Sequence, residues 1–167
     1  MSRGFVKEED QEEAPFIPPR AALPAGVTNY VTPEGLEQLQ QEKKSLEEER
    51  SGLNISAETE RRRAQAVIDG KLMLLNERIT SARVLKPEDQ PAEEVRFGAL
   101  VSLKERKTGQ LQEFRIVGVD EADVKKKKIS FVAPIVRAIT GKKVGETAEF
   151  LLGKEKRELE IKKITYK

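Results

Sequence analysis

Residues 32–46, TPEGLEQLQQEKKSL, and residues 66–82, AVIDGKLMLLNERITSA, decide the fold. In and just after the first segment, leucines recur at seven-residue spacing, at Leu39, Leu46 and Leu53. In the second, apolar residues recur at steps of four and three, at Ile68, Leu72, Leu75, Ile79 and Ala82. This is the a/d pattern of a coiled coil. The short turn between the segments predicts an antiparallel helical hairpin over residues 31–85.

The signals for helix ends support this hairpin. Thr32 is a good N-cap, and Pro33 suits the first helical position because its missing N–H costs nothing there. Ser56 can cap the second helix, with Glu58 and Glu60 in its first turns. Carboxylates are favourable there because they face the positive end of the helix dipole.

The chain changes its pattern on both sides of the hairpin. Residues 1–30 contain several spaced prolines and read as an extended or disordered leader, although Phe5, Phe16, Ile17 and Leu23 could let it lie against a folded surface as a strap. Residues 86–94, KPEDQPAEE, form a linker. Beyond it, a period of two predicts antiparallel strands at 96–103, 113–119, 128–132, 146–152 and 157–164, with a short helix near 134–139. The fold class is therefore α+β, with a small β domain over residues 95–167.

Composition excludes much chemistry. The 167 residues include neither Cys nor His, so disulfides, zinc fingers, Cys nucleophiles and His bases are excluded. Only hard, oxygen-liganded ions such as Mg²⁺ remain plausible as metals. No apolar run approaches the roughly 18 residues of a membrane helix. The N-terminus is acidic where a signal peptide would be apolar, so we expect a cytoplasmic protein without membrane contact.

Charge is unevenly distributed along the chain. Residues 95–167 carry 18 basic and 10 acidic side chains, a net charge of +8, whereas the whole chain carries only +2. This asymmetry favours an acidic partner for the C-terminal part, or a lysine-rich solubilising surface. The acids of Asp120–Asp123 could be a weak Mg²⁺ site or a solvated loop. Arg61, Arg62 and Arg63 form a basic collar that is a candidate for facing nucleic acid.

Three stretches resemble the bacterial transcript cleavage factors GreA and GreB. The hairpin opens T-x-x-G-x-x-x-L, at Thr32, Gly35 and Leu39. RIVGVDEAD at 115–123 is similar to the family's RIVG-x-DEAD stretch, and APIVRAITGK at 133–142 to its SPIARALxGK stretch. The resemblance covers roughly residues 30–167 and omits the leader. It implies a coiled-coil hairpin followed by an FKBP-like domain.

The resemblance also implies a function. In the family, the C-terminal domain docks on RNA polymerase at the secondary channel, and an Asp and a Glu at the hairpin tip help hold a second Mg²⁺ at the polymerase active site. The expected role is therefore a transcription elongation factor that modulates elongation or rescues backtracked complexes. It would be a monomer and not itself an enzyme. It would bind no cofactor alone and share Mg²⁺ with the polymerase, and it would meet nascent RNA or DNA only within the elongation complex.

The tip departs from the family pattern. It lacks the family's two acids three residues apart, leaving Glu58 and Glu60 as the only candidates. The hairpin also looks shorter by about two turns per arm, which shortens its reach by roughly 11 Å. An alternative is therefore a cleavage-incompetent regulator that occupies the secondary channel. A third reading is an FKBP-like domain with a peptide-binding or chaperone role.

The resemblance also locates a docking surface. It implies that Ala133, Pro134 and Ile135 contact the polymerase, with an acidic turn nearby at Asp120, Glu121 and Asp123. An exposed Pro-Ile pair offers a rigid apolar anchor, and exposed acids can steer a basic partner. The alternative is that Pro134 only starts the short helix while Ile135 fills the core. The family usually has Ser where Ala133 stands, so one hydrogen bond to the partner is lost.

Overall fold

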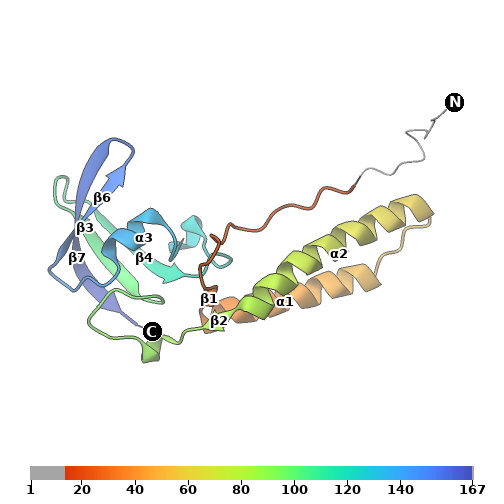
Figure 1. The fold of residues 1–167 in the computed structure, drawn as a ribbon, viewed down its shortest axis with the longest axis horizontal. Helices are drawn as coiled ribbons and strands as arrows, with labels where there is room; N and C mark the ends of the chain where they lie inside the picture. Colours follow the sequence, from red (N-terminus) through yellow and green to blue (C-terminus); the bar gives the residue numbers. More distant parts are fainter. Residues whose placement is uncertain (1–13, 167) are drawn as a thin grey trace.

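The computed structural model describes residues 14–166. A helical hairpin projects from a curled sheet domain, and the hairpin tip and the sheet lie at opposite ends of the molecule (Figure 1). In chain order the elements are β1 Tyr30–Val31, α1 Pro33–Ser51, α2 Glu58–Ser81, β2 Arg83–Val84, the 3₁₀ turn η2 Pro87–Asp89, β3 Leu100–Glu105, β4 Leu111–Val117, the 3₁₀ turn η3 Val124–Lys126, β5 Lys128–Ser130, α3 Pro134–Ile139, β6 Thr147–Leu152 and β7 Glu155–Thr165. The α+β class predicted from sequence is confirmed.

The hairpin forms where the heptad pattern predicts it. Thr32 caps α1 by accepting a hydrogen bond from the Gly35 N–H, and Pro33 takes the first helical position. Helix α2 begins at Glu58 after Ala57, which offers no side-chain cap, so the expected cap at Ser56 is wrong. The two helices pack through one narrow apolar stripe whose buried members are Leu39, Leu46, Ile68 and Leu75.

A two-stranded parallel sheet closes the base of the hairpin. Strand β1 precedes α1 and pairs with β2, which follows α2, with Tyr30 opposite Arg83 and Val31 opposite Val84. Asn29 extends this closure because its buried amide donates to the Arg78 carbonyl and to the Ser81 hydroxyl. The start and the end of the hairpin are therefore held together where it joins the sheet domain.

The sheet domain has five strands in the order β5-β4-β3-β7-β6. Strands β3, β4, β6 and β7 pair antiparallel as expected, but β5 runs parallel to β4. The predicted first strand also starts later, at Leu100, because Phe97–Ala99 form a turn in which Gly98 has a φ of +88°. Helix α3 occupies its predicted position and packs beside β6.

The core of the sheet domain reaches the base of the hairpin. Phe114, Leu103, Ile116 and Ile161 are almost fully buried within it. At its edge, the rings of Tyr30, Phe97 and Phe131 form a cluster with centroid separations of 5.6–6.0 Å. Such tilted and edge-to-face contacts are favourable for aromatic pairs. Tyr30, at the entrance to the hairpin, is therefore anchored in the sheet domain.

The leader and the linker both lie against the folded parts. Residues 14–29 have no helix or strand and run along the hairpin (Figure 1). Phe5 lies outside the described residues.

The linker is held at its end because the Tyr166 hydroxyl donates to the Glu94 carbonyl and accepts from the Arg96 N–H. Burial raises the pKa of Tyr166 above its usual value.

Candidate functional site

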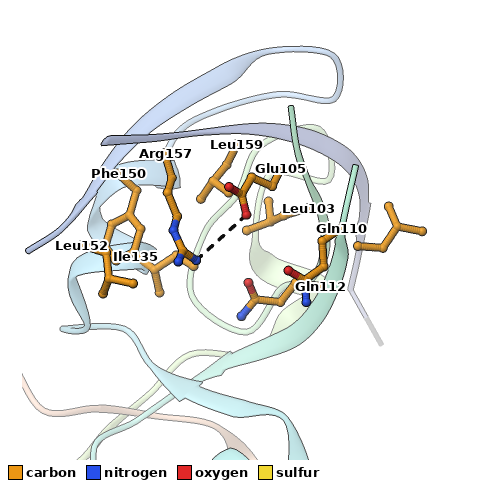
Figure 2. A pocket seen from close by; sticks show the side chains of 10 residues that line it. Leu103, Glu105, Gln110, Gln112, Ile135, Phe150, Leu152, Arg157 and Leu159 are labelled. Carbon is orange, nitrogen blue, oxygen red and sulfur yellow. Dashed lines mark ion pairs between the residues drawn. The ribbon is translucent and has the colours of Figure 1, made fainter. Parts of the chain in front are cut away.

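A groove of about 520 Å³ opens on the sheet domain beside α3. The buried side chains of Leu103 and Leu159 form its floor, while Leu111 and Leu152 on its rim are 70% and 50% exposed. Figure 2 shows Ile135 grouped with apolar side chains from β6, and two glutamines from the β3–β4 hairpin across from them. Exposed leucines beside a concave apolar floor are typical of a protein-docking surface.

Arg157 gives the groove a charged centre. Its guanidinium lies 4.0 Å from the Glu105 carboxylate and 3.5 Å from that of Glu155. Its Nε is buried and has no hydrogen-bond partner among residues 14–166. The rest of the guanidinium is partly exposed, since the side chain is 35% exposed, and offers a positive charge to a partner's carbonyl or carboxylate oxygen.

The three residues expected to dock lie at the edge of this groove. Pro134 is exposed at the first position of α3, Ala133 is half-buried, and Ile135 lines the groove while also packing on the domain core. One face of the Ile135 side chain therefore contributes to the core and the other to the groove, while its contact with a polymerase stays a prediction.

The acidic turn lies elsewhere, at the joint between the hairpin and the sheet domain. Glu121 is 8% exposed; its carboxylate accepts from the Thr32 hydroxyl and lies 3.4 Å from the Lys128 ammonium. A Cβ on Gly35 would come within 2.6 Å of this carboxylate, so the glycine makes room for it. The T-x-x-G motif thus serves two purposes, because Thr32 caps α1 and binds Glu121 while Gly35 leaves space.

Asp120 is held within the same joint. Its carboxylate accepts from Arg20 Nε at 2.9 Å and from Arg78 Nη1 at 3.1 Å, and its side chain is 7% exposed. The expectation that Asp120 and Glu121 are exposed to a partner is therefore wrong. Asp123 is half-buried and caps η3 by accepting from the Lys125 N–H. Contact of these three acids with a polymerase stays a prediction.

The hairpin tip carries the remaining candidates. Glu58 and Glu60 are both exposed in the first turn of α2, the position that favours carboxylates at a helix N-terminus. Arg61 is half-buried, whereas Arg62 and Arg63 are exposed. Among residues 14–166, no group of three or more carboxylates converges as a metal site, at the tip or at the acidic turn.

Sequence comparison places these features in a known family. The family described as "Transcription elongation factor, GreA/GreB, C-term" matches residues 90–166, which include the groove, α3 and the acidic turn. GreA of Thermodesulfovibrio yellowstonii is 35% identical over 131 residues, which cover 70% of this chain and 83% of that protein. The chain belongs to the GreA/GreB family.

Another relative and two solved structures are also similar to this chain. GreA of Hyphomonas neptunium is 39% identical over 103 residues, or 62% of this chain and 66% of that protein, so this match spans just under two thirds of the relative. Among solved structures, GreA factor homolog 1 of Thermus thermophilus is 22% identical with a TM-score of 0.39, covering 83% of this chain and 99% of that one. The GreA/GreB factor of Nitrosomonas europaea is 18% identical with a TM-score of 0.41, covering 84% of this chain and 99% of that one.

The sequence reasoning missed the groove and the joint. Leu152 falls in a predicted strand and Leu111 lies just before one, and apolar side chains at such exposed positions are a signal for a docking surface. Arg20 and Arg78 gave no local signal, because their partner Asp120 lies 100 and 42 positions away. Within residues 14–166, no helix is long and apolar enough to cross a bilayer.

Proposed function

We propose that this chain is a Gre-type elongation factor that docks on bacterial RNA polymerase through the groove beside α3 and directs its hairpin into the secondary channel. The observation that carries the proposal is the coincidence of the family match over residues 90–166 with an apolar groove lined by Ile135. The groove is rimmed by exposed leucines and centred on Arg157. It would accept an apolar side chain flanked by an oxygen acceptor.

The tip favours a regulator over a cleavage factor. Glu58 and Glu60 are two positions apart on a helix, so their side chains point roughly 200° apart around its axis at about 100° per residue. Two carboxylates in that arrangement cannot converge on one ion. We therefore propose that the hairpin occupies the channel without positioning a second Mg²⁺. Contact of Arg61, Arg62 and Arg63 with RNA or DNA inside the elongation complex is part of the same proposal.

Polymerase binding tests the docking proposal directly. Leu152→Asp places a charge on the rim of the groove, and we expect it to abolish co-purification with RNA polymerase core enzyme. Leu151→Asp is the matched control, because Leu151 is a 66% exposed neighbour on β6 that does not line the groove. It should bind normally. Ile135→Asp should also lose binding, with circular dichroism checking that the domain remains folded.

Equal binding by wild type and both groove variants would show that docking occurs elsewhere. If wild-type protein fails to bind polymerase at all, the peptide-binding or chaperone reading takes its place.

Transcript cleavage separates the two Gre-type functions. The protein is added to backtracked elongation complexes with Mg²⁺, and short 3′ RNA fragments are measured. We expect binding without fragments, and slower cleavage when GreA is added together with this chain. Fragment release that disappears in Glu58→Ala/Glu60→Ala but persists in Glu47→Ala/Glu48→Ala, which alters exposed acids on α1, would instead establish a cleavage factor.

A further inference from the structure

The leader makes specific contacts with both parts of the molecule. Arg20 donates from Nη1 and Nη2 to the two carboxylate oxygens of Glu42 on α1, at 2.6 and 3.1 Å, and from Nε to Asp120 in the sheet domain. One guanidinium thus joins the leader, the hairpin and the acidic turn. A planar, two-pronged pairing of this kind also fixes the orientation of the groups it joins.

Arg78 completes the connection from α2. It donates from Nη1 to the second oxygen of Asp120 and from Nη2 to the Ala21 carbonyl at 2.5 Å. The side chains of Arg20, Arg78 and Asp120 are 18%, 15% and 7% exposed. Charge pairs with this little water access are screened far less by salt than surface pairs. The hydrogen bonds from Arg20 to Glu42, and the one to Asp120, raise the pKa of the guanidinium against the opposing effect of burial.

A second, apolar contact is made three residues earlier in the leader, by Ile17 against α2. A Cβ on Gly70 would come within 2.4 Å of Ile17 Cδ1, so the glycine forms the seat for this isoleucine. Glycine inside a helix costs about 1 kcal/mol relative to alanine. Its presence in the middle of α2 is explained by the leader packing there. Spaced prolines at 15, 18, 19 and 24 reduce the conformational freedom that the leader loses on binding.

We propose that residues 14–29 are an intramolecular strap that fixes the angle between the hairpin and the sheet domain, with Arg20 as its positioning residue. Without the strap, the two parts are joined by two-residue strands, the aromatic cluster, the contacts of Glu121 and the Arg78–Asp120 pair. The strap also contacts the hairpin at Glu42 and Gly70, farther from its base. A contact there resists bending of the hairpin with a longer lever arm than a contact at the base. It therefore sets where the hairpin tip lies relative to the groove.

The absence of cysteine makes this measurable. Cysteines introduced at Asn54, in the tip loop, and at Lys154, in the exposed β6–β7 turn, would carry spin labels whose separation is measured by pulsed electron resonance. We expect one narrow distance distribution in the otherwise wild-type protein. Arg20→Ala should broaden it, and Gly70→Val, which expels Ile17 from its seat, should broaden it independently.

The control is Arg106→Ala, which removes an ion pair with Glu158 on the sheet domain away from the strap. Its distribution should match wild type. The proposal fails if Arg20→Ala and Gly70→Val both leave the distribution unchanged, or if Arg106→Ala broadens it equally. The helical ellipticity of each variant shows whether the hairpin is intact. Because the measurement uses the free protein, its outcome is independent of whether the groove binds polymerase.

Discussion

The sheet domain buries a cluster of twelve apolar residues between its sheet and α3, whereas the hairpin cluster buries five along a single stripe. The outward face of each hairpin helix is exposed to water. The hairpin orders 43 helical residues with this small core, from the 19 of α1 and the 24 of α2. Helices with so little tertiary packing are marginal. Much of the hairpin's stability must therefore come from its base.

The difference suggests a division of labour. Because it has the larger core, we expect the sheet domain to keep its fold when the hairpin is destabilised. The hairpin gains its position from contacts with that domain, through Thr32, Tyr30 and the strap. The hairpin should then depend on the sheet domain for its stability, but not the reverse. Unfolding of the sheet domain removes the base of the hairpin, whereas unfolding of the hairpin leaves the sheet intact.

The largest effect should follow a cavity in the sheet domain. Phe114 is 1% exposed in its core, and Phe114→Ala should lower the free energy of unfolding by about 3–5 kcal/mol. We expect hairpin and sheet to unfold together in this variant, since the base of the hairpin is lost with the sheet. Urea denaturation followed by far-ultraviolet circular dichroism and tyrosine fluorescence measures both. A hairpin that keeps its helical signal after the sheet has unfolded would contradict one-way dependence.

The reverse experiment places the cavity in the hairpin. Leu75 is fully buried in the stripe, and Leu75→Ala should destabilise the hairpin by about 2–4 kcal/mol. Here helical ellipticity should be lost at low urea while amide signals of the sheet domain persist in nuclear magnetic resonance spectra. Met73→Ala, at an exposed position on the same helix, is the control and should change little. Simultaneous loss of sheet signals would show that the two parts form one cooperative unit.

This contrast also explains what the sequence could predict. The hairpin and α3 follow from local signals, since heptad spacing and Pro33 or Pro134 at the first helical position act within a few residues. The parallel pairing of β4 with β5 was missed because only residues 118–127 join them, fewer than a parallel crossover usually needs. The sheet β1–β2 was missed because two-residue strands have no period to detect.

The candidate site divides in the same way. The position of Ile135 could be predicted because a contiguous motif carries it on α3. The burial of Asp120 could not, because an isolated acidic turn looks solvated until distant arginines are brought to it. The leader's role as a strap was one of two open readings. The contacts of Arg20 and Ile17 with the folded parts favour the strap for residues 14–29.

A smaller effect should follow at the joint. Thr32→Val keeps the side chain's shape but removes both the N-cap of α1 and the hydroxyl donor to Glu121. We expect a loss of about 1–3 kcal/mol, combining a lost cap with a buried carboxylate short of one partner. The loss should appear in the helical signal first. Thr80→Val, at an exposed position on α2, should cost far less. If Thr32→Val and Thr80→Val lowered the free energy of unfolding equally, the contacts of Thr32 with Gly35 and Glu121 would contribute nothing beyond an ordinary surface threonine.

The smallest effect concerns the outer surface of the hairpin. Arg50 on α1 donates from Nε to Asp69 on α2 at 2.6 Å, and both side chains are about half exposed. The hydrogen bond from Arg50 lowers the pKa of Asp69 below its usual value. The pair therefore stabilises the hairpin above the unfolded-state pKa of about 4, and this contribution disappears as the pH falls through the lower folded-state value.

Asp69→Asn should accordingly lower the melting temperature of the hairpin slightly at pH 7, and the difference from wild type should vanish in strong acid. It should also shrink in 1 M salt, because water and ions screen a pair on this exposed surface. The strap's Arg20–Asp120 pair, nearly closed to water, should keep most of its effect in the same salt. Measuring Asp69→Asn and Arg20→Ala side by side at low and high salt therefore separates a surface ion pair from one that positions the hairpin. If both effects fade equally, the enclosure of Asp120 contributes nothing in solution, and the hairpin is held at its base alone.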